Sequence, residues 1–164
     1  MRIEVLLDLK TRLGESPVWD VEQQRLWWVD SLDGRLFACN AQGGAIKSWD
    51  VRQKIGSFAL RQSGEGGAAD GATVDSEGYL WNALVYAGKL VRYTPEGKVD
   101  RIIEMPVKKV TSVMFGGENL DVLYVTSMAQ PPLPRFPEDN QLRGSLFAIY
   151  DLGVTGVAER RFAG

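Results

Sequence analysis

The sequence contains no histidine. This absence excludes serine–histidine and cysteine–histidine nucleophilic machinery, imidazole-bound zinc, and acid–base catalysis by an imidazole ring. Any chemistry of this chain must therefore use carboxylates, amides, hydroxyls, lysine or arginine, or a hard metal ion held by oxygen atoms.

Cysteine is almost absent as well. Cys39 is the single cysteine, so it has no partner within the chain for a disulfide, and it lies in a stretch of alternating apolar residues. We interpret it as a buried structural thiol rather than a nucleophile. A reducing, cytoplasmic location fits this cysteine usage.

The chain also lacks an excess of charge and a long hydrophobic run. Lys and Arg number 19 and Asp and Glu number 21, which gives a net charge of −2. The composition therefore predicts no binding to nucleic acid or to a membrane surface. No apolar run approaches the ~20 residues that span a bilayer, and the opening MRIEVLLDLKTR does not resemble a signal peptide. We expect a cytoplasmic protein with a single domain.

What the sequence does contain is a repeat, whose three copies begin at Glu15, Asp70 and Thr111. Each copy has a strand, a turn, a second strand (RLWWVD, YLWNAL or VLYVTS) and a third strand that opens on glycine. A fourth strand follows in AIKSWDV, VDRIIEMP and VAERRFA. β-Branched and aromatic residues between regularly spaced turns predict strands throughout, and no segment shows helical periodicity.

Units of four antiparallel strands are typical of β-propeller blades. We therefore predict an all-β chain with three propeller blades in one truncated domain. The first blade and the start of the next cover residues 15–62, the second blade covers 70–107, and the third covers 110–164 with an insertion at 129–143. Residues 1–10 resemble a spare strand, which in many propellers completes the last blade.

Two segments have competing interpretations. Residues 64–69 loosely match a dinucleotide-binding loop, but such a loop must open a helix, and this one leads into predicted strands. The proline-rich insertion at 129–143 is either a binding loop or a surface excursion. The pair Lys108 and Lys109 is interpreted as a solvated charge run.

The starts of innermost strands gather at one mouth of a propeller's central channel. Here they carry Glu15, Asp70, Thr111 and Ser112, so carboxylates and hydroxyls would converge on one small volume. Oxygen ligands of this kind suit Ca²⁺, Mg²⁺ or Mn²⁺, and two facing carboxylates without a cation would repel each other. Alternatively, Asp70 belongs to an ordinary Asp-Gly turn and Glu15 to a solvated loop.

Several stretches resemble the senescence marker protein/gluconolactonase/luciferin-regenerating enzyme family. LGESPVWDVEQQRLWWVD is similar to its opening, ADGATVDSEGYLWNALVYAGKLVRYTPEGKV and MPVKKVTSVMFGGENLDVLYVTS to its later blades, and GSLFAIYDLGVTGVAERRFAG to its C-terminus. The resemblance implies six-bladed propellers that bind one divalent cation and hydrolyse sugar lactones. It implies that Glu15 and Asp70 hold the metal and that Asp70 is also the base toward water. Calcium is the first expectation, with manganese, magnesium or zinc as alternatives.

The sequence departs from the family pattern in its middle. After IGSFALRQSG, which resembles the start of the second blade, the pattern passes directly to EGGAADGATVD, which resembles the start of the fifth. The NGL-W segment that carries a third metal ligand and the RFNDGK segment that contacts the sugar have no counterpart. About three blades are therefore missing near residues 64–66.

Two function classes follow from this departure. The chain is either a metal-dependent sugar lactone hydrolase, with activity reduced or lost through the missing blades, or a non-catalytic half-propeller that acts as a scaffold or binding module. Three blades would leave two open apolar faces, and three is half of six. We therefore expect a two-fold homodimer that rebuilds a six-bladed ring and takes a small sugar lactone as substrate.

Overall fold

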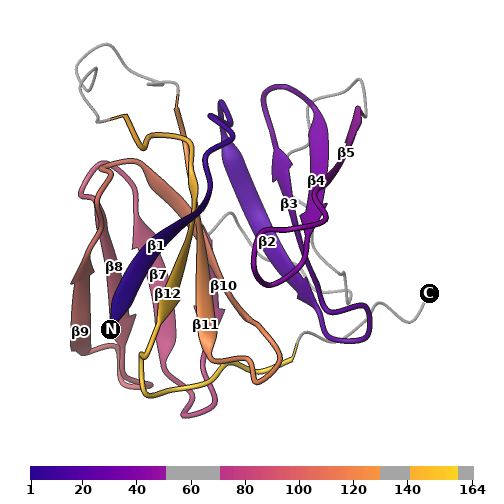
Figure 1. Ribbon diagram of the computed structural model, residues 1–164. Coiled ribbons are helices and arrows are strands. Elements are labelled where there is room, and N and C mark those ends of the chain that lie inside the picture. The colour runs from indigo at the N-terminus through magenta and orange to yellow at the C-terminus, as the bar shows by residue number, and fades with distance from the viewer. Residues whose placement is uncertain (51–70, 130–140, 159–164) are drawn as a thin grey trace, which may run out of the picture.

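The computed structural model describes residues 1–50, 71–129 and 141–158. Within these ranges every regular element is a strand, and the strands form three four-stranded antiparallel sheets (Figure 1). This confirms the predicted all-β class and the units of four strands. The described residues contain no helix long and apolar enough to cross a membrane. The predicted boundaries at residues 62 and 70 and most of the 129–143 insertion lie outside the described residues.

Two of the sheets follow the chain order. The first sheet consists of β2 (Gly14–Asp20), β3 (Arg25–Asp30), β4 (Arg35–Cys39) and β5 (Lys47–Asp50). The second sheet consists of β6 (Ala72–Val74), β7 (Leu80–Leu84), β8 (Lys89–Tyr93) and β9 (Val99–Glu104). Each is a meander in which neighbouring strands are joined by short turns.

The third sheet combines the two ends of the described chain. It consists of β10 (Val110–Gly116), β11 (Val122–Ser127), β12 (Leu146–Tyr150) and β1 (Arg2–Leu7). β1 pairs antiparallel with β12, with Ile3 opposite Ile149. The segment VAERRFA was expected to supply this fourth strand, but Val157 and Ala158, its first two residues, form no strand because β1 already pairs with that edge of β12. The rest of that segment lies outside the described residues.

The third sheet lies between the other two, as Figure 1 shows. Its strands alternate, so that Val113 and Phe115 of β10 join a core with the second sheet while Met114 joins a core with the first. All seven residues of β10 are buried. Both faces of this sheet are therefore covered, and apolar alternation in both directions holds the three sheets in the order second, third, first.

Cys39 lies in β4 and belongs to the core between the first and third sheets. Its thiol is free and buried, and burial raises the pKa of Cys39 to about 12. The prediction of a buried structural thiol is confirmed, because a thiol with this pKa stays protonated and unreactive near neutral pH.

Candidate functional site

The first strands of the three sheets start close together. The hydroxyl of Thr111, in β10, donates a hydrogen bond to the carbonyl oxygen of Gly14, in β2. A Cβ atom added to Gly71, just before β6, would lie 2.1 Å from the Cα atom of Ser112. Only glycine fits such an approach, so the chain before β6 packs directly on β10. The starts of β2, β6 and β10 thus form one mouth at one end of the sheets.

The backbone is irregular at this mouth. In β2 the pairing register shifts between Glu15 and Val18, and Ser16 between them has a φ of 50°. In β10 the register shifts between Val110 and Ser112. Bulges of this kind redirect side chains and are frequent next to active sites, and a non-glycine residue in the left-handed region is strained. The sequence carried no signal for either bulge, since both depend on how the strands pair.

Of the two predicted metal ligands, the structure describes Glu15 but not Asp70. Glu15 is half-buried in β2, opposite Val29 of β3 and close to the start of β10. Asp70, the second predicted ligand and the predicted base, lies outside the described residues, although the adjacent Gly71 packs on Ser112. The pairing of Glu15 with Asp70 therefore stays a prediction.

The donor chemistry at the mouth fits a hard cation. The described side chains there include the carboxylate of Glu15 and the hydroxyls of Thr111 and Ser112, and hard divalent cations prefer such oxygen ligands. The side chain of Lys109 lies there as well. Within residues 1–50, 71–129 and 141–158, no group of three or more His, Cys, Asp or Glu side chains could hold a metal ion. Glu15 alone is an incomplete site, so a metal here requires at least one further ligand such as Asp70.

Lys109 is a residue of the mouth that the sequence analysis misinterpreted. It directly precedes β10, two positions before Thr111, and is only 1% exposed, whereas Lys108 is exposed. The interpretation of both lysines as solvated is wrong for Lys109. The segment between β9 and β10 is held in place because the backbone N–H groups of Gly88 and Met128 donate hydrogen bonds to the carbonyl oxygens of Lys108 and Lys109. These contacts are long-range, so the sequence carried no signal for them.

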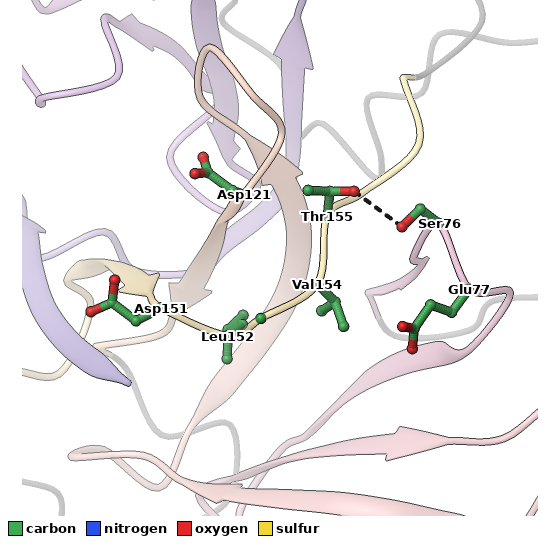
Figure 2. A pocket seen from close by; sticks show the side chains of 8 residues that line it. Ser76, Glu77, Asp121, Asp151, Leu152, Val154 and Thr155 are labelled. Atoms are coloured by element: carbon green, nitrogen blue, oxygen red, sulfur yellow. Dashed lines mark hydrogen bonds between the residues drawn. The ribbon is translucent and has the colours of Figure 1, made fainter.

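A pocket of about 370 Å³ lies at the other end of β6 and β10. It is lined by Ser76 and Glu77 after β6, Asp121 after β10, and residues 151–155. Figure 2 shows that the carboxylates of Glu77, Asp121 and Asp151 point to different places rather than to one centre. Hydrogen bonds between Ser76 and Thr155 instead fasten the C-terminal segment to the β6–β7 turn.

Beside this pocket is a buried ion cluster. Arg92 of β8 contacts the carboxylates of Asp75, Glu77 and Asp100, and its side chain is almost fully buried. Burial opposes the charge of Asp75, but hydrogen bonds from Trp81, the backbone of Tyr79 and Arg92 outweigh it and hold the pKa of Asp75 below its ordinary value of 3.8. The cluster stabilises the ionised forms of its members. Its contacts within the described chain connect parts of one sheet and leave it no evident role in ligand binding.

A comparison with protein families identifies the chain. The model described as SMP-30/Gluconolactonase/LRE-like region matches residues 13–69 and 60–129, which together span more than half of the sequence. The chain belongs to this family. The resemblance seen in the sequence is thereby confirmed, and the two matches meet where the SMP-30/gluconolactonase pattern was predicted to lose its middle blades.

Similar proteins of the SMP-30/gluconolactonase family are about twice as long. Regucalcin of Xenopus laevis is 32% identical over 147 residues, which are 89% of this chain and 48% of regucalcin. The 6-deoxy-6-sulfogluconolactonase of Pseudomonas putida is 40% identical over 114 residues, 70% of this chain and 38% of that protein. A solved luciferin-regenerating enzyme superposes with a TM-score of 0.51 at 28% identity, over 91% of this chain and 48% of that one. The chain thus spans about half the length of these relatives and has half of their propeller fold.

Proposed function

We propose that this chain is a divalent-metal-dependent hydrolase of sugar lactones whose site lies at the mouth. The convergence of the starts of β2, β6 and β10 carries the proposal, because Thr111 hydrogen-bonds to Gly14, the neighbour of Glu15, and Gly71, the neighbour of Asp70, packs on Ser112. The family and the similarity to a 6-deoxy-6-sulfogluconolactonase support a lactone as substrate.

Glu15 and Asp70 would hold the cation through carboxylate oxygens, with calcium as the first expectation. A bound divalent cation supplies Lewis-acid polarisation of the lactone carbonyl. Asp70 accepts a proton from the attacking water as its oxygen bonds to the carbonyl carbon. The ring C–O bond then breaks, the leaving oxygen takes up a proton, and the product is the open hydroxy acid.

The missing half of the propeller supports an alternative, non-catalytic function. The chain spans 48% of the superposed luciferin-regenerating enzyme, and its sequence has no counterpart of the family segments NGL-W and RFNDGK. Loss of positioning groups alone removes orders of magnitude in rate. The alternative function is a non-catalytic half-propeller that serves as a scaffold or binding module.

Hydrolysis of gluconolactone by metal-stripped protein, with Ca²⁺, Mn²⁺, Mg²⁺ or Zn²⁺ added back, separates the two. We expect metal-dependent turnover above the spontaneous rate and a loss of at least about 100-fold in Asp70→Asn. Asp121→Asn is the matched control, since it removes an exposed carboxylate at the opposite end of the sheets. Equal rates with and without protein, for every metal, would reject the hydrolase and favour the scaffold.

A further inference from the structure

We propose that two copies of this chain pair across a two-fold axis, so that the open face of the first sheet in each copy covers the open face of the second sheet in the other. The result is a closed ring of six sheets, since the described residues of each copy form three. This inference concerns assembly, and it does not depend on whether the ring hydrolyses lactones.

The second strand of each repeat shows which faces are open. In β3, β7 and β11 the second position of the aligned motif is a leucine, and the third position is an aromatic residue. Neighbouring residues of a strand point to opposite faces, so the leucine marks one face of each sheet and the aromatic residue marks the other. In the order second, third, first, each leucine points to the preceding sheet and each aromatic residue to the following one.

The leucines are buried where a preceding sheet exists. Leu123 of the third sheet packs in the core shared with the second sheet, and Leu26 of the first sheet packs in the core shared with the third. Both are fully buried. Leu80 of the second sheet has no preceding sheet among the described residues, and it is 39% exposed.

The aromatic residues repeat the pattern at the other end. Trp81 of the second sheet is fully buried and forms a T-shaped pair with Phe115 of the third, with 5.9 Å between ring centroids. Tyr124 of the third sheet is fully buried and stacks at 5.9 Å on Trp19 of the first. Trp27 of the first sheet has no following sheet in the described chain. It is half-buried and stacks at 5.4 Å on Trp49 within its own sheet.

The open face of the second sheet is apolar and strongly exposed. Strand register places Val74, Leu80, Tyr93 and Val99 in one row across this face and Ala72, Asn82, Val91 and Ile102 in the next. In the second row Val91 is buried, and the exposed apolar side chains lie on the outer strands and at Leu80. Val99 is 57% exposed and Ile102 is 52% exposed. A contiguous patch of this kind on a sheet marks an interaction site.

The open face of the first sheet has matching character. Register places Val18, Trp27, Ala38 and Lys47 in one row and Glu15, Val29, Leu36 and Trp49 in the next. The centre of this face is apolar, with Val29 and Ala38 fully buried, and Trp49, on the outer strand, is 41% exposed. Tryptophans are over-represented among residues that dominate the energy of interfaces. The two faces are the two ends of one repeating series, and Figure 1 shows them on opposite sides of the molecule.

A second copy of the chain fits the open faces of both the first and the second sheet. Within the chain, the second sheet packs on the third sheet and the third sheet packs on the first. Packing of the first sheet of one copy on the second sheet of the other copy continues this series. One chain covers 48% of a luciferin-regenerating enzyme, so two copies supply the missing half. A two-fold axis makes both new contacts at once and leaves no open face, which closes the assembly at two.

Sedimentation of the wild-type protein at micromolar concentration should give a dimer. Ile102→Glu places a charge on the open face of the second sheet, and Trp49→Glu places one on the open face of the first. Each variant alone breaks both contacts of the ring, so each should sediment as a monomer, with dimerisation weakened by at least about 100-fold. Val21→Glu is the matched control, because Val21 is an exposed apolar residue in the β2–β3 turn outside both faces.

An equimolar mixture of the two variants provides the decisive measurement. One contact in the mixed dimer joins the unaltered first sheet of one chain to the unaltered second sheet of the other, so the mixture should recover dimers that neither variant forms alone. If Ile102→Glu is monomeric but Trp49→Glu stays dimeric, the second sheets pair with each other and the proposal is wrong. A folded wild-type monomer, or dissociation of the Val21→Glu control, also overturns it.

Milder variants keep the test usable if either charged variant fails to fold. Ile102→Ala and Trp49→Ala shorten the same two side chains without adding charge. Each should raise the dimer dissociation constant by about 10-fold or more, while Val21→Ala should leave it unchanged. Equal dissociation constants for wild type and both alanine variants would reject the proposed faces.

Discussion

The first and second sheets come from the same repeat, yet different interactions fix their packing against the third sheet. In the first sheet the packed face is aromatic, with Trp28 stacked on Phe37 at 5.3 Å inside an apolar core. The second sheet packs on the third through the opposite face of the repeat, and the end of that face holds the ion cluster of Asp75 and Arg92 next to the apolar core. A common backbone pattern therefore does not require a common source of stability.

The difference is visible at one equivalent position. Asp20 is the last residue of β2 and Asp75 directly follows β6, and each carboxylate accepts backbone N–H groups of the turn after it at 2.9–3.0 Å. Asp20 is half-buried and has this capping role at the surface. The second oxygen of Asp75 also accepts the indole N–H of Trp81 and the guanidinium of Arg92, each at 2.8 Å. Asp75 can be buried because its neighbours supply the hydrogen-bond donors that a buried carboxylate requires.

The largest expected effect tests the aromatic side of this comparison. Trp28→Ala removes one of the two tryptophans of the core between the first and third sheets and should lower the free energy of unfolding by about 4 kcal/mol. The loss should be the same at neutral and at acidic pH, since Trp28 does not titrate. Chemical denaturation at a fixed protein concentration measures it, with Val21→Ala as a surface control expected within about 0.5 kcal/mol of wild type.

The next effect tests the ionic side. Asp75→Asn keeps the turn acceptor but leaves the buried Arg92 without its fully buried counter-ion, so it should lower the free energy of unfolding by about 3 kcal/mol at neutral pH. The pKa of Asp75 lies below its unfolded value of 3.8. Its charge therefore stabilises the fold above about pH 4, and this contribution is lost as the pH falls through the folded pKa. The gap between wild type and variant should shrink accordingly in acid.

Asp20→Asn is the matched control for this prediction. It makes the same change at the equivalent turn, where the carboxylate is half-buried, and should cost less than about 1 kcal/mol with little pH dependence. If Asp75→Asn costs no more than Asp20→Asn, or if its cost is constant down to strong acid, the ion cluster does not stabilise the second sheet.

The sequence predicts local features of this fold well. Alternation, turn residues and the repeat predict strands and units of four, because these depend on neighbouring residues. The starts of β2 and β10 lie together as the repeat alignment implies, and the hydroxyl of Thr111 donates a hydrogen bond to the carbonyl oxygen of Gly14. The sequence offers residues 1–10 and the segment VAERRFA as fourth strands of the third sheet, and the pairing of β1 with β12, a long-range event, gives that position to β1.

Features that depend on strand register could not be predicted. Arg92 is on the packed face by alternation with Leu90, but its pairing with Asp75, seventeen positions away, requires the register of β6, β7 and β8. The bulge at Ser16 likewise arises from how β2 meets β3. These features depend on how several strands are arranged in the folded protein. The geometry of the predicted site could not be predicted either, because the bulges shape the mouth.

The smallest expected effect separates burial from charge within the ion cluster. Glu77 contacts the same guanidinium of Arg92 as Asp75 does, but its side chain is 54% exposed. An exposed partner of an ion pair contributes at most about 1 kcal/mol and is screened by salt. Glu77→Gln should therefore lower the free energy of unfolding by less than about 1 kcal/mol in dilute buffer, and the loss should fade in high salt. Chemical denaturation of wild type, Glu77→Gln and Asp75→Asn at two salt concentrations measures this. A Glu77→Gln cost equal to that of Asp75→Asn would show that charge, and not the burial of Asp75, makes the second sheet different from the first.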